Sequence, residues 1–278
     1  MCNPMTTKSN PIRFFSSLIL VVAMFLQNHV GASDAEDTME LVEASQNPIA
    51  NLISVPFEHN IDLNVGPEDG TVQAMNLKPV LPTEFERFNL INRFIAPVIH
   101  QQERVPGEGS EFGLGNLTYQ GFLSPRETGK YIWGVGPILT LPTRTDERLG
   151  ADKWSAGPGA VVLSISGPWV VGALVTHSWS FAGDNDENNV NTTSLQYFVN
   201  YNFGNDWYLT SNPTMSADWS TESSNRYKVP VGGGIGHLVR FGDKPVDFRL
   251  RGFYNVEKPD RTASWTVQFE VKLLFPKK

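Results

Sequence analysis

The C-terminal segment of the chain alternates strictly between two kinds of side chain. Aromatic or aliphatic residues occupy every second position from Trp265 to Phe275, and the positions between them are polar or charged until Leu274. Successive side chains of a β-strand point to opposite faces, so this segment has one apolar and one polar face. Its length matches the ~9–11 residues of a strand tilted across a bilayer, whereas strands of soluble proteins are usually nearer ~5–6 residues. The segment therefore predicts a transmembrane β-strand.

The same alternation recurs along the chain, and the helical period is absent from this region. Because an open sheet edge is intolerable in hydrocarbon, the first and last strands must pair with each other. The sequence thus predicts an all-β fold, a closed antiparallel transmembrane β-barrel of about 12 strands. The expected strands are 52–65, 71–81, 87–100, 112–123, 129–141, 153–165, 169–181, 192–203, 207–219, 227–240, 245–256 and 264–275.

The connections between these strands alternate in length. Bacterial single-chain barrels have an even number of strands, short periplasmic turns and longer outer loops. This rule predicts that both termini are periplasmic. The expected outer loops are 66–70, 101–111, 142–152, 182–191, 220–226 and 257–263, and the expected inner turns are 82–86, 124–128, 166–168, 204–206 and 241–244.

Composition agrees with a membrane barrel and argues against nucleic-acid binding. Charged residues make up 18% of the chain, below the roughly 25% of an average soluble domain. All 7 tryptophans follow the N-terminal apolar stretch, most of them near expected strand ends, and tryptophan favours the membrane interface. The formal net charge of -7 is not that of a nucleic-acid-binding protein.

The N-terminus predicts export. Lys8 and Arg13 precede the apolar stretch Phe14–Leu26, and small residues follow at Val30–Ala32. This is the pattern of a signal peptide over residues 1–32, cleaved near Ala32. At about 13 residues, the apolar stretch is shorter than the ~20 needed to span a bilayer. The expected location of the mature chain is the cell outer membrane.

The mature chain is expected to contain no thiol, since Cys2 is the one cysteine and leaves with the signal peptide. Disulfides and cysteine metal sites are thereby excluded. Residues 33–51 form an acidic, partly amphipathic segment, which is either a periplasmic tail or a plug in the lumen. Residues 52–278 are the expected barrel.

Charged and amide side chains at the alternate strand positions are expected to line the lumen, because an Arg or Lys facing lipid at midplane costs about 2–4 kcal/mol. Two interpretations compete: a network that fills and rigidifies a narrow lumen, and a selectivity ring around a pore. The candidates are Lys78, Arg93, Lys130, Asn200, Asn202, Asp218, Lys228, Arg240, Asp247, Arg249, Arg251, Gln268, Glu270 and Lys272.

The sequence predicts no enzyme, no cofactor and no metal site. It contains neither HExxH nor GxSxG, the motifs of zinc and serine hydrolases. His177 and Ser178 are adjacent, so in a strand they point to opposite faces and cannot act as a base–nucleophile pair. Gly232–Gly236 lies in an alternating strand with no helix after it, so small residues that ease crowding in the lumen explain it better than a phosphate loop. The less favoured alternatives are an outer-membrane lipid hydrolase and a secreted soluble β-barrel, the latter needing no detergent for extraction.

Several motifs resemble a Gram-negative outer-membrane family catalogued as the putative MetA-pathway of phenol degradation and often labelled a transporter. The resemblance runs from about Asn47 to Pro276, and Gly115-Asn116 departs from the Gly-Asp expected there. The motifs are Asn47–Phe57, Gly113–Asn116, Ile132–Pro137, Lys153–Pro158, Tyr197–Asn202, Trp207–Ser211 and Val231–Gly234.

The resemblance implies an outer-membrane barrel, and a channel for small compounds that include hydrophobic or aromatic ones. Its partners would be outer-membrane lipid, a small-molecule solute and the barrel assembly machinery. That machinery would recognise Phe275, which a short C-terminal tail follows. The alternative is a structural or adhesive barrel without transport.

Overall fold

The computed structural model describes residues 32–102, 109–186 and 189–277; residues 1–31 of the predicted signal peptide and part of the 101–111 loop lie outside them. The chain divides into two units, Met1–Asp37 and Thr38–Lys278, and the second contains the sheet. The strands are β1 (Ile53–Val65), β2 (Gly70–Leu77), β3 (Val80–Glu84), β4 (Phe88–Gln101), β5 (Glu111–Leu114), β6 (Leu117–Pro125), β7 (Ile132–Leu141), β8 (Lys153–Ser166), β9 (Trp169–Gly183), β10 (Asn191–Gly204), β11 (Trp207–Ser211), β12 (Thr214–Asp218), β13 (Tyr227–Phe241), β14 (Lys244–Glu257) and β15 (Trp265–Phe275).

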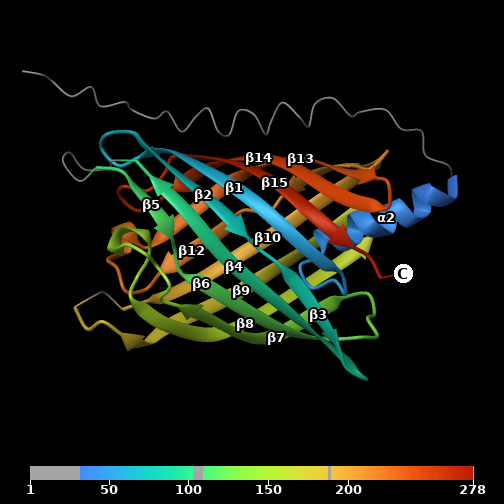
Figure 1. The fold of residues 1–278 in the computed structure, drawn as a ribbon, viewed down its shortest axis with the longest axis horizontal. Helices are drawn as coiled ribbons and strands as arrows, with labels where there is room; N and C mark the ends of the chain where they lie inside the picture. Colours follow the sequence, from blue (N-terminus) through green and yellow to red (C-terminus); the bar gives the residue numbers. More distant parts are fainter. Residues whose placement is uncertain (1–31, 103–108, 187–188, 278) are drawn as a thin grey trace, which may run out of the picture. The chain divides into compact units, whose positions relative to one another are not determined.

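These fifteen strands form one closed antiparallel barrel of twelve positions, because three positions hold two strands in succession: β2 and β3, β5 and β6, and β11 and β12. β15 pairs with β1 along its whole length, from Leu63↔Trp265 to Ile53↔Phe275, and the other neighbours complete the ring (Figure 1). The predicted barrel, its strand number and the pairing of its first and last strands are therefore confirmed.

The three interruptions have local causes. Pro79 lies between β2 and β3, and Pro213 between β11 and β12. Proline has no backbone N–H to donate to a neighbouring strand, so it interrupts the ladder. Between β5 and β6, Asn116 leaves the ladder and instead bonds the loop before β8: its Nδ2 donates to Ala151 O (2.7 Å) and its Oδ1 accepts from Arg144 N (3.2 Å).

Tight turns lie at one end of the barrel and longer connections at the other. Two-residue turns join β8 to β9, β10 to β11 and β13 to β14. Asn205 and Asp206, in the second of these turns, have φ of 49° and 63°. Positive φ at both central positions matches the twist of a hairpin, and Asn and Asp tolerate it better than most residues. The predicted alternation between long and short connections is thus confirmed.

The barrel is apolar outside and polar inside. The outward side chains of Leu250 and Trp265 are 53% and 50% exposed, whereas inward Asp247 and Arg251 are 0% and 1% exposed. A soluble monomer rarely exposes a continuous apolar surface larger than a few hundred Å², yet exposed aromatic and aliphatic side chains occur on strands around the ring. This distribution is typical of a barrel surrounded by lipid and excludes the soluble-barrel alternative on physical grounds.

Helix α2 (Ala32–Gln46) precedes the barrel. Its part from Thr38 onward belongs to the same unit as the strands. In this part, Val42 is 1% exposed and packs in a cluster with Leu52, Tyr208, Leu238 and Leu274. Burial of apolar side chains therefore attaches the end of the helix to inward-facing residues of the barrel. Within the described residues, no helix is long and apolar enough to cross a bilayer.

Candidate functional site in the barrel lumen

The lumen contains a cavity of about 370 Å³ whose walls come from nearly every part of the barrel. Strands β1, β3, β4, β6, β7, β9, β10, β12, β14 and β15 contribute side chains to it, and residues 44–50 close one side. The alternation of each strand explains why polar groups gather here, since residues with outward apolar neighbours must point inward.

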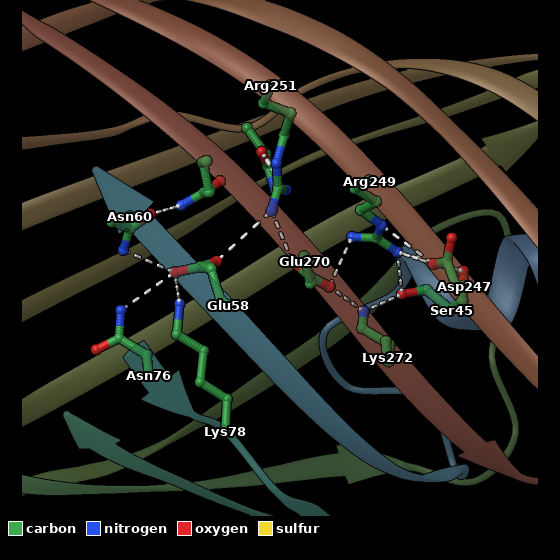
Figure 2. A network of polar contacts seen from close by, with 12 residues as sticks. Ser45, Glu58, Asn60, Asn76, Lys78, Asp247, Arg249, Arg251, Glu270 and Lys272 are labelled. Carbon is green, nitrogen blue, oxygen red and sulfur yellow. Dashed lines mark hydrogen bonds and ion pairs between the residues drawn. The ribbon is translucent and has the colours of Figure 1, made fainter. Parts of the chain in front are cut away.

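Glu270 on β15 is the centre of an ion network on one wall (Figure 2). Its carboxylate lies 2.6 Å from Arg251 Nη2, 3.6 Å from Arg249 Nη1 and 3.4 Å from Lys272 Nζ. Glu58 on β1 extends the network, with Arg251 Nη2 at 3.6 Å and an ion pair to Lys78. Buried charges need such partners because the interior screens them poorly.

A third carboxylate, Asp247, joins this network to Tyr208. Its Oδ2 lies 2.6 Å from Arg249 Nη2, and the Tyr208 hydroxyl donates to its Oδ1 at 2.5 Å. Arg249 Nε donates to the same hydroxyl at 2.7 Å. Tyr208 fits because Gly236 faces it: a Cβ at Gly236 would lie 2.1 Å from the phenol carbon Cζ. Within the Gly232–Gly236 run, Gly236 therefore does relieve crowding in the lumen.

The network also holds the end of helix α2. Ser45 Oγ donates to Asp247 Oδ2 (2.9 Å), and Ser45 O accepts from Arg249 Nη2 (3.0 Å) and Lys272 Nζ (2.8 Å). Figure 2 shows Ser45 reaching these side chains from the helix. Gln46 Nε2 adds a bond to Asn202 Oδ1 (2.7 Å). The bonds of Ser45 to Asp247, Arg249 and Lys272 each involve a charged group, and such bonds are stronger than neutral ones. The segment is therefore attached by both its polar and its apolar groups.

The rest of the cavity wall is less charged. Ile138, Leu174 and Phe198 supply apolar surface from β7, β9 and β10, and threonine and serine hydroxyls lie between such residues. The hydroxyls on this wall are those of Thr118, Thr140, Thr176, Ser178, Ser194 and Thr214. The cavity thus has a charged wall and a mixed apolar and hydroxyl wall.

The predicted lumen residues fall into groups. Lys78, Arg93, Asn200, Arg249, Glu270 and Lys272 line the cavity. Asn202, Asp247 and Arg251 are buried beside it. Arg240 Nε donates to Thr38 Oγ1 (3.2 Å) and Gln268 Nε2 to Asn60 Oδ1 (2.6 Å), while Asp218 and Lys228 lie on β12 and β13 near the longer loops. Lys130 is separate from them all: β7 begins only at Ile132, and Lys130 is exposed, with Nζ 5.6 Å from the Tyr131 ring centroid.

Several contributors to the site were missed from the sequence, among them Glu58 and Ser45. Glu58 follows outward-facing Phe57 on β1, so the alternation rule could have identified it as inward-facing. Ser45 could not have been found in this way. It lies on a helix outside the strand pattern, and its partners are about two hundred residues away in the chain.

The positions of His177 and Ser178 do not support the hydrolase alternative. His177 is outward on β9, where its Nδ1 lies 2.8 Å from Thr193 Oγ1, whereas neighbouring Ser178 lines the cavity. The pair is thus on opposite faces, as predicted. The Thr193 hydroxyl also accepts from Trp219 Nε1 (2.8 Å), which satisfies these polar groups on the outer surface. Among the described residues, no three His, Cys, Asp or Glu side chains are grouped to hold a metal.

The fold is similar to those of solved outer-membrane proteins. The COG4313 outer membrane channel from Pseudomonas putida F1 matches with a TM-score of 0.62 and 16% identity, over 81% of this chain and 94% of that one. The Salmonella typhi outer membrane phospholipase matches with a TM-score of 0.43 and 13% identity, over 84% and 96%. The CymD monoaromatic hydrocarbon channel matches with a TM-score of 0.40 and 10% identity, over 87% and 93%.

Sequence comparison identifies a family. No curated protein matches the chain. A family model described as "Putative MetA-pathway of phenol degradation" matches residues 65–271.

Proposed function

The chain belongs to the family described as "Putative MetA-pathway of phenol degradation", and from this premise we propose that it is an outer-membrane channel for small solutes, including apolar and aromatic ones. The observation that carries the proposal is the lumen cavity: a space of about 370 Å³ with both apolar and polar walls, inside a barrel whose outer surface suits lipid. Small-molecule sites typically have volumes of roughly 300–1,000 Å³. The similar Pseudomonas putida structure is itself described as an outer membrane channel.

The proposed location is the outer membrane. Residues 1–32 act as a signal peptide, cleaved near Ala32, and the barrel assembly machinery inserts the mature chain into the lipid. The short turns then face the periplasm together with both termini, in keeping with the usual topology of such barrels.

The segment from Thr38 to Leu52 acts as a plug in this proposal. It contributes Ser45, Gln46 and Ala50 to one side of the cavity, so a solute that crosses the barrel must displace it or pass beside it. Its attachment combines hydrogen bonds at Ser45 with the apolar contact of Val42, and both must break for full opening. We expect a narrow conductance with infrequent larger openings.

Planar-bilayer recording of the purified full chain tests the channel. The expected result is small steps in salt, together with swelling of proteoliposomes in small uncharged solutes. Silence at all voltages, with no swelling, would contradict the proposal. It would favour the second candidate, a structural barrel, which the ion network around Glu270 supports because it stiffens the wall and fills part of the lumen.

A further inference from the structure

The charges around the cavity do not balance. In the network and on the cavity wall, five cations face three carboxylates, so positive charge is in excess by two. The cations are Lys78, Arg93, Arg249, Arg251 and Lys272, and the carboxylates are Glu58, Asp247 and Glu270. A lumen with an excess of one sign attracts solutes of the opposite sign.

Arg93 on β4 is the least compensated of these cations. The other four are in ion pairs of 4 Å or less, but Arg93 is in none among the described residues. Its Nη1 is buried with no hydrogen-bond partner there. The guanidinium carbon lies 6.0 Å from the ring centroid of Phe122, and Glu58 acts on Arg93 only over a longer distance. A buried cation in this state is costly, and a bound anion would offset that cost.

The surroundings of Arg93 suit the body of an amphiphilic anion. Gln120 is its cross-strand partner and lines the same cavity, where its amide NH2 group can donate to a carboxylate, while its oxygen, an acceptor, cannot. The apolar side chains of Ile95 and Ile138 lie on this wall. A charged head and an apolar body could therefore both be accommodated in one cavity.

We propose that this cavity selects small amphiphilic carboxylates, with the carboxylate at Arg93 and Gln120 and the apolar body against Ile95, Ile138, Leu174 and Phe198. The proposal rests on the channel function proposed above, for which it names the substrate class. Arg93 is then the specificity residue, because a guanidinium can donate two parallel hydrogen bonds to a carboxylate.

Binding of benzoate and benzamide to the full chain in lipid nanodiscs, measured by calorimetry, tests the assignment. The two probes have similar shapes and differ in charge. Benzoate is expected to bind at least tenfold more tightly than benzamide. Arg93→Gln should abolish this preference, and Arg93→Lys should restore part of it. Lys130→Gln, which removes an exposed cation outside the cavity, should leave the preference unchanged.

Equal affinity for the two probes, or a preference that survives Arg93→Gln, would overturn the assignment. The reversal potential in a salt gradient provides a second measurement: the wild type should prefer chloride to potassium, and Arg93→Gln should reduce this selectivity more than Lys130→Gln. Binding needs no ion flow, so the two proposals fail separately. A chain that binds benzoate and passes no current contradicts the channel alone, and one that conducts without preferring anions contradicts the anion site alone.

Discussion

At the scale of single residues, the charge network depends on Glu270, whose carboxylate joins cations from two strands. Glu270→Gln should leave Arg249, Arg251 and Lys272 with too little negative charge nearby. Breaking a buried ion pair by removing one partner typically costs about 3–5 kcal/mol, and we expect a loss of unfolding free energy of that order in urea titrations of the reconstituted protein. Glu84→Gln, in an exposed ion pair with Lys277, should leave the unfolding curve unchanged. Equal curves for all three proteins would argue against a stabilising network.

Packing around Tyr208 yields a second residue-scale prediction. Gly236→Ala places a methyl group against the phenol ring, and overpacking of a filled site typically costs about 1–3 kcal/mol. Gly252→Ala provides the matched control on β14, since a Cβ there meets nothing within 4 Å. Unfolding by urea should separate the two variants. If Gly252→Ala proved the more damaging, the placement of Tyr208 in the lumen would be wrong.

The face to which a side chain points could be predicted from the sequence where strand alternation alone determines it. Alternation placed Asp247, Arg249 and Glu270 inward because their outward neighbours are apolar. The rule had no means of showing which inward charges pair, since pairing depends on register across strands. Lys130 illustrates the other limit: near a strand end, the side-chain period is lost once the chain leaves the ladder.

At the scale of elements, strand positions were predictable because each long strand crosses the whole barrel wall. The interruptions at Pro79 and Pro213 were detectable in principle, as proline cannot donate to a ladder. The contacts of helix α2 were not predictable in the same way. A short amphipathic segment is compatible with a free tail, and only the barrel interior determines the partners of Ser45 and Val42.

The β7–β8 loop provides an element-scale prediction, because Asn116 holds it with two hydrogen bonds. Asn116→Ala should free the backbone around Arg144 and Ala151, so that hydrogen exchange over 142–152 accelerates by tenfold or more. Exchange in the 219–226 loop serves as the internal reference and should not change. Unaltered exchange over 142–152 would show that other contacts hold this loop.

At the scale of the whole molecule, the exposed apolar surface distinguishes a lipid-facing barrel from a soluble one. Leu250, midway along β14, is 53% exposed. In a soluble protein, Leu250→Lys would be nearly neutral, whereas facing lipid near the midplane it should cost about 2–4 kcal/mol. Phe112→Lys, on short β5 at the end with the longer loops, should cost far less. Folding titrations in lipid vesicles measure both, and a neutral Leu250→Lys would contradict the membrane-spanning account.

Closure of the whole barrel was predictable for a physical reason: a sheet in hydrocarbon has no tolerable edge. The cavity was not predictable, because its size depends on how inward side chains such as Tyr208 and Phe198 pack together. Sequence patterns determine which residues face the lumen, and side-chain packing determines how much space remains.

The central claim is that the lumen is a path closed by the segment from Thr38 to Leu52, and single-channel recording of Val42→Asp tests it most directly. The change places a carboxylate in the apolar contact of Val42 with Leu52, Tyr208, Leu238 and Leu274, which should release the helix. We expect larger or more frequent openings than in the wild type, with Glu40→Asp, on the exposed face of the same helix, matching the wild type. A folded Val42→Asp barrel with wild-type conductance would contradict the claim.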